Sequence, residues 1–205
     1  MHEAADIASS IPAIVILSMW WAFLSTLEML LHPGDVPDTD SRRTAAPQPE
    51  AEAAAAAQDA RLADLRAVEP GFDPGAFLRG ACGVYETVLD AYASGDSAAL
   101  EPLLSPEVFA AFGAACAERQ ARGETLELAL VGIDKAEILD VDVLSDRAEV
   151  TVLFRTQFVG VVRTDTGEVA SGSPVAIQTA ADRWTFARPL PGRRADWVIV
   201  ATDVE

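Results

Sequence analysis

Histidine, cysteine and lysine are scarce in this sequence of 205 residues. His2 and His32 are the only histidines, Cys82 and Cys116 are the only cysteines, and Lys135 is the only lysine. A histidine triad, a histidine general base or a cluster of histidine metal ligands is therefore excluded after residue 32. Two cysteines are too few for a disulfide scaffold or a closed zinc site. We expect no metal and no cofactor.

Basic residues are also few, at 15 against 32 acidic residues, which gives a formal net charge of −17. Nucleic-acid binding needs clustered lysine and arginine to neutralise phosphates, so we expect no nucleic-acid partner. An acidic stretch lacks the ligand order of a calcium-binding loop and indicates a solvated acidic face instead. Its members are Asp134, Asp140, Asp142 and Asp146.

Charge is absent from residues 7–27, a run of 21 residues rich in isoleucine, leucine and tryptophan. A helix of this length spans about 30 Å, the thickness of the hydrocarbon core of a bilayer. A cleaved signal peptide would begin with a basic region, whereas this chain begins Met1-His2-Glu3. We therefore predict an uncleaved transmembrane anchor over residues 1–31, with a buried helix as the alternative. The residues that represent this anchor are Ile14, Leu17, Trp20, Trp21, Leu24 and Glu28.

The flanks of the apolar run suggest an orientation. The first basic residues after it are Arg42 and Arg43, within the range of the positive-inside bias, so the C-terminal bulk is expected in the cytoplasm. Glu28 either reaches interfacial water or pairs with a partner helix. Trp20 and Trp21 lie near the middle of the span, where they could face lipid or pack on another membrane protein.

Two segments separate the anchor from the remainder of the chain. Residues 32–49 contain four prolines and no apolar periodicity, which is typical of a linker. Residues 50–69 are rich in alanine and predict a helix. Leu62, Leu65 and Val68 form a thin apolar stripe on it, which is more often docked on its own domain than on a partner.

Residues 70–205 predict a domain of the α+β class. Capping residues begin helices at Asp73-Pro74, at Asp96 (a short helix through Leu104) and at Ser105-Pro106. After Gly123 the apolar period changes from 3.6 to 2, which indicates strands. Helices followed by antiparallel strands predict a curved sheet with helices packed on its concave face.

Few residues in this domain could carry chemistry. Tyr85 and Tyr92 lie on the core face of a predicted helix near Asp90, and an acid–base role for the three is the less favoured alternative to packing. Asp182 and Arg188 lie on the same side of a strand as Trp184 and Phe186. This pattern predicts either a binding groove or core aromatics with charges at the strand ends. We expect no enzyme.

An ordered set of motifs resembles the Tim44-like domain. It comprises Gly71-Phe72-Asp73, Gly95-Asp96, Ala136-Glu137-Ile138 and the closing pattern Asp182-x-Trp184-Thr185-Phe186-x-Arg188 through Trp197 to Thr202. The resemblance implies an NTF2-like cone with an apolar pocket between sheet and helices. The pocket residues expected on this basis are Phe154, Phe158, Trp184, Phe186, Arg188 and Tyr85.

The family works in protein translocation and membrane-protein biogenesis, so the resemblance implies a non-catalytic, membrane-anchored adaptor. It would bind protein segments through an apolar pocket with an acidic rim. Membrane-anchored relatives occur in alphaproteobacteria, which implies a single-pass protein of the bacterial inner membrane. The alternative is an accessory or assembly subunit of a larger inner-membrane complex, such as a respiratory one. Either way, the expected partners are inner-membrane proteins or complex subunits.

Overall fold

The computed structural model describes residues 49–190 and 196–204. The predicted anchor, with Ile14, Leu17, Trp20, Trp21, Leu24 and Glu28, lies outside these residues, as does almost all of the predicted linker. Within the described ranges, no helix has both the length and the apolar character that crossing a bilayer requires.

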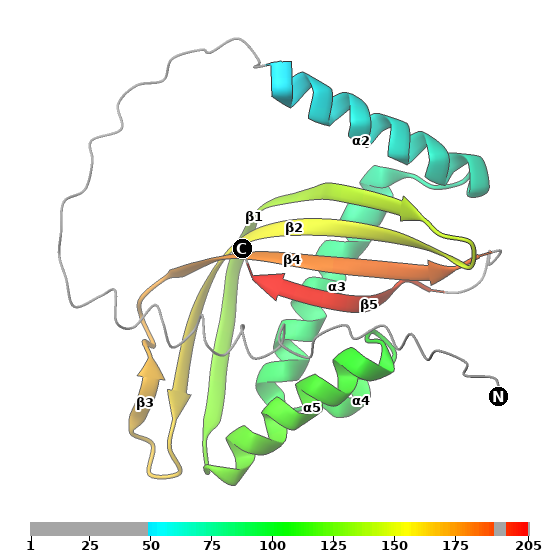
Figure 1. The fold of residues 1–205 in the computed structure, drawn as a ribbon. Coiled ribbons are helices and arrows are strands. Elements are labelled where there is room, and N and C mark those ends of the chain that lie inside the picture. Colours follow the sequence, from blue (N-terminus) through cyan, green and yellow to red (C-terminus); the bar gives the residue numbers. More distant parts are fainter. Residues whose placement is uncertain (1–48, 191–195, 205) are drawn as a thin grey trace, which may run out of the picture.

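The described chain is of the α+β class, as expected, with helices first and strands afterwards (Figure 1). The helices are α2 (Pro49–Val68), α3 (Pro74–Ser94), α4 (Ser97–Leu100) and α5 (Pro106–Ala121). The strands are β1 (Thr125–Val143), β2 (Arg147–Arg163), β3 (Val169–Gly172), β4 (Gln178–Pro189) and β5 (Val198–Val204). They form one antiparallel sheet in the order β1-β2-β4-β5, and β3 pairs with β2.

The helices begin at the predicted capping residues. The carboxylate of Asp96 accepts hydrogen bonds from the N–H groups of Ala98 and Ala99, both at 3.1 Å, and so caps α4. The sequence predicts that this helix continues to Leu104, which is wrong, because α4 ends at Leu100. Pro102 lacks the N–H that the next helical turn requires.

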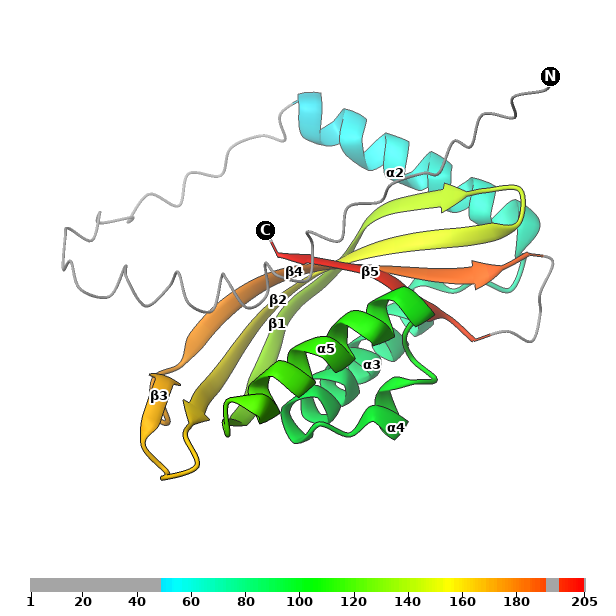
Figure 2. The ribbon, with the colours of Figure 1, turned by 60° about the horizontal axis from the view of Figure 1, so that its bottom comes forward.

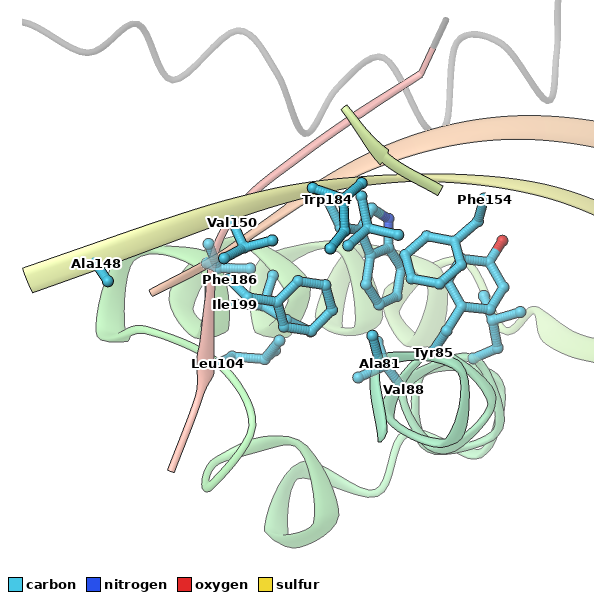
Figure 3. Close-up of a cluster of buried hydrophobic side chains, with 14 of the residues drawn as sticks. Ala81, Tyr85, Val88, Leu104, Ala148, Val150, Phe154, Trp184, Phe186 and Ile199 are labelled. Carbon is cyan, nitrogen blue, oxygen red and sulfur yellow. The ribbon is translucent and has the colours of Figure 1, made fainter. Parts of the chain in front are cut away.

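The core lies between the concave face of the curved sheet and helices α3 and α5 (Figure 2). Tyr85 of α3 stacks on Phe154 of β2 and packs at a tilt against Trp184 of β4, with both ring centroids 4.6 Å away (Figure 3). All three side chains are at most 1% exposed. Because aromatic rings bury large apolar areas, this cluster fixes α3 against the centre of the sheet.

Helix α2 packs against β1. Leu65 is fully buried and Leu62 is 9% exposed, whereas Val68 is 49% exposed. The side-chain amide of Gln58 donates to the backbone carbonyl of Ile138 in β1. The stripe on α2 is therefore docked on its own domain through its first two leucines.

The two outer strands of the sheet differ in what covers them. At β5, the N–H of Ser105 donates to the Ile199 carbonyl and the N–H of Ile199 donates to the Leu103 carbonyl, both at 2.8 Å. The connection between α4 and α5 thus covers the outer edge of β5 at Ile199. The opposite outer strand is β1, whose 19 residues pair with β2 through three register irregularities. Figure 1 shows that the long ribbon of β1 and β2 bends, so that α2 lies over the second half of β1 only.

Candidate functional site

A pocket of about 760 Å³ lies between the C-terminal part of α3, α4 and the facing ends of β1 and β2. Most of its lining residues are small or apolar, three are carboxylates, and none is lysine or arginine. The lining residues are Thr87, Asp90, Ala91, Ala93, Ser94, Asp96, Ala99, Leu126, Glu127, Leu128, Ala129, Val159, Val161 and Pro174.

The three carboxylates form the rim of this pocket, which we call the acidic rim: Asp90, Asp96 and Glu127. All three residues are exposed, whereas Ala91 and Val161 of the lining are 4% and 2% exposed. Asp96 is held by its capping bonds, and Glu127 accepts a hydrogen bond from Nε of Arg163 at 3.0 Å. The pocket therefore combines buried apolar residues with exposed acidic ones, of which Glu127 is paired with Arg163, a combination suited to a ligand with both apolar and cationic groups.

The pocket residues expected from the resemblance lie elsewhere. Four of them are buried in the core, at no more than 2% exposure: Tyr85, Phe154, Trp184 and Phe186. Phe158 is half-buried, and Arg188 forms an ion pair with Glu69 and lies 4.7 Å from the Trp197 ring centroid. None of the six lines the pocket described above. The aromatics on β4 are thus core residues, one of the two alternatives that the strand pattern left open.

Asp182 is buried rather than placed at an exposed strand end. The hydroxyl of Tyr85 donates to its Oδ2 at 2.5 Å and lies 3.3 Å from the hydroxyl of Thr156. Burial raises the pKa of the Asp182 carboxyl, and the hydrogen bond from Tyr85 opposes that rise. Burial, and then the nearby carboxylate, raise the pKa of Tyr85, so this hydroxyl keeps its proton at neutral pH.

The three residues with a possible acid–base role do not come together. Tyr85 pairs with Asp182, and Asp90 belongs to the acidic rim. The guanidinium of Arg119 lies 4.8 Å from the Tyr92 ring centroid and donates to the Tyr92 carbonyl at 2.6 Å. The pairing of Asp182 had one sequence signal, a charged residue at the inward position of a strand next to Trp184. No feature of the sequence near Asp182 could identify Tyr85 as its hydrogen-bond partner.

Metal binding has no support in the described part of the chain, where no three histidine, cysteine, aspartate or glutamate side chains lie close enough to share an ion. Cys82 is half-buried and Cys116 is buried, and both are free thiols. Burial, with a smaller contribution from Glu86, raises the pKa of the Cys82 thiol, which makes it less reactive.

These features define a class of protein: an α+β domain whose bent antiparallel sheet carries helices on its concave face, with an acid-rimmed pocket at one end. The Tim44-like domain family matches residues 58–204 of the chain, which therefore belongs to that family. The match begins inside α2, in agreement with the docking of that helix. The resemblance read from the sequence motifs is confirmed.

One curated relative is the mitochondrial import inner membrane translocase subunit TIM44-1 of Arabidopsis thaliana, which is 26% identical over 123 residues. The alignment covers 60% of this chain and 26% of the relative, so the chain spans about a quarter of that protein.

Two solved structures are also similar. The intermembrane space region of the chloroplast protein ARC6 has 15% identity and a TM-score of 0.45, with 62% of this chain and 95% of that chain covered. An NTF2-like superfamily protein from Salmonella enterica has 14% identity and a TM-score of 0.38, with coverages of 65% and 92%.

Proposed function

We propose that this chain is a non-catalytic, membrane-anchored adaptor in protein translocation or inner-membrane protein biogenesis. It binds segments of other proteins at the acid-rimmed pocket. The observation that carries the proposal is the pocket itself, with Asp90, Asp96 and Glu127 around an apolar floor. Membership of the Tim44-like family and the name of the Arabidopsis relative, an import translocase subunit, support the process.

The charge of the chain supports a basic partner. The segment from Pro70 to the end contains 21 acidic and 11 basic residues, a net charge of −10. Acidic rims attract basic segments and raise the rate of encounter more than they raise affinity. The apolar floor then provides the contact that retains an amphipathic segment.

The absence of catalysis is part of the proposal. Tyr85 and Asp182 are a close pair of titratable side chains, and they are 1% and 6% exposed. Neither lines the pocket, so a ligand there would not reach them. We further propose that residues 1–31 anchor the protein in a bacterial inner membrane, since anionic lipid would repel this acidic domain and the apolar run must hold it there. The positive-inside bias of Arg42 and Arg43 supports a cytoplasmic domain.

The experiment is a pull-down of the tagged full chain in mild detergent, with and without the double substitution Asp90→Asn and Asp96→Asn. Asparagine at position 96 retains the capping oxygen, so the fold is preserved while two rim charges are lost. The matched control is Asp142→Asn with Asp146→Asn, which removes two exposed charges away from the pocket.

We expect the parent chain to recover translocation components and many membrane proteins in substoichiometric amounts. The variant with Asp90→Asn and Asp96→Asn should recover several-fold less of them, and the control variant nearly as much as the parent. Equal reduction in both variants would contradict binding at the pocket. A version lacking residues 1–31 tests the alternative function. One dominant complex at fixed stoichiometry, lost with those residues, would identify the chain as an accessory subunit instead.

A further inference from the structure

The first half of β1 has an outer edge that no described strand occupies. The sheet order places β1 at one side, where β2 is its strand partner. Helix α2 meets the second half of β1, through Gln58 at Ile138 and an ion pair of Arg61 with Asp140. Figures 1 and 2 both show α2 away from the end of β1 that lies near β3. Residues 125–133 are thus a stretch of sheet edge for which the described part of the chain offers no strand partner.

Residues 125–130 carry few of the devices by which proteins usually protect an edge strand. Residues 125–133 contain no proline and no lysine. Exposed residues alternate along it, at Thr125, Glu127, Ala129 and Val131, and Val131 is 54% exposed. The only charged side chain among these residues, that of Glu127, is engaged by Arg163. The first register irregularity follows directly after Leu130, so residues 125–130 pair with β2 without interruption.

The open edge borders the acid-rimmed pocket. Residues 126, 127, 128 and 129 all line the pocket, although successive side chains of a strand point to opposite faces. Four consecutive lining residues therefore mean that the pocket reaches the backbone of β1 as well as one face of it. A strand added beside β1 would lie next to the acidic rim.

We propose that an extended segment of a partner polypeptide adds to the sheet along residues 125–131 of β1, with basic side chains at every second position. Main-chain hydrogen bonds to β1 would hold it, and alternate side chains would face Asp90 and Asp96 on the helical side. The inference rests on the proposed function and specifies its binding mode and its ligand. A second copy of this chain fits less well, because it would bring another net charge of −17 to an acidic edge.

The test uses the full chain in mild detergent and synthetic nine-residue peptides in which lysine alternates with threonine or valine. Amide hydrogen exchange is measured with and without peptide, and affinity is measured by fluorescence anisotropy. Two further peptides carry N-methyl groups on either the odd or the even residues. A strand added at an edge donates from only one of these sets, so one methylated peptide should bind about tenfold more weakly or worse and the other nearly normally.

We expect slowed exchange within residues 125–131 on peptide binding, and weaker binding by the variant with Asp90→Asn and Asp96→Asn. Binding that protects only α3 and α4, with both methylated peptides equal to the parent, would overturn strand addition and leave the proposed function intact. If the peptides do not bind but the rim variant still recovers fewer proteins in the pull-down, strand addition is likewise overturned and the proposed function stands. Failure of both would remove the proposed function as well. Slow amide exchange in residues 125–131 without any peptide would also overturn the inference. If that protection rises with protein concentration, a second copy of the chain occupies the edge. If it vanishes when residues 1–48 are deleted, those residues occupy it.

Discussion

Replacing Tyr85 by phenylalanine isolates the polar interaction at the centre of the core. The substitution removes one oxygen, which donates to Asp182 at 2.5 Å and lies 3.3 Å from the Thr156 hydroxyl. The ring remains, and with it the ring contacts with Phe154 and Trp184. The change in stability therefore reports the hydrogen bonds and not the burial of apolar area.

The magnitude follows from what the substitution leaves behind. Asp182 is 6% exposed, so its carboxyl would lose a donor without gaining water in exchange. A buried polar group left without its partner costs about 1–3 kcal/mol, and a charged one costs more. We expect a loss of about 2–3 kcal/mol in the free energy of unfolding. For a domain of this size that corresponds to a fall in Tm of about 4–12 °C.

The measurement is urea unfolding at pH 7, followed by tryptophan fluorescence, to which the buried Trp184 contributes, and by circular dichroism. Tyr92→Phe is the matched control, since Tyr92 is half-buried and Arg119 donates to its backbone carbonyl, which the substitution keeps. The control should cost about 1 kcal/mol or less. In a background with Asp182→Ala, Tyr85→Phe should cost much less than in the parent. A loss no larger than that of the control, or the same in both backgrounds, would refute the argument.

Three further predictions concern the stability of the fold. Because burial raises the pKa of Asp182, the folded state holds the carboxyl proton to higher pH than the unfolded state does. The parent should therefore lose stability relative to Asp182→Asn as the pH rises from about 4. A difference in unfolding free energy that stays constant between about pH 4 and 8 would contradict this. Gly172→Ala should destabilise by about 2 kcal/mol or more, measured by Tm, because φ is +78° and a Cβ would collide with the Gly160 carbonyl; an unchanged Tm would contradict that geometry. Leu65→Ala should cost about 2–5 kcal/mol in urea unfolding and Val68→Ala about 0.5 kcal/mol or less, and equal costs would argue against the docking of α2.

Local chemistry accounts for what the sequence predicted well. Helix starts depend on a capping side chain and a proline within one turn, so Asp73-Pro74 and Ser105-Pro106 could be located without tertiary information. The switch from a helical period to a period of two after Gly123 likewise separated helices from strands. Misjudged boundaries involve competing local effects, as where Pro102 ends α4 early.

The site could not be predicted in the same way, because it depends on contacts between distant segments. Tyr85 and Asp182 are 97 residues apart in sequence, and either could have been an exposed polar group. The acidic rim combines the end of one helix, the cap of the next and a strand. The resemblance indicated that a pocket exists, and large aromatic residues were the expected lining. In the structure these aromatic side chains fill the core instead.

The position of β5 has a consequence for how the protein is made. Strand β5 supplies the fully buried Ile199 and hydrogen-bonds to Leu103 and Ser105, more than 90 residues earlier in the chain. During synthesis the core therefore stays incomplete, and one edge of β4 stays unpaired, until residues 198–204 have left the ribosome. A premature stop before Val198 would not produce a slightly shorter domain. It would produce a chain with an unpaired inner strand, a substrate for aggregation or proteolysis.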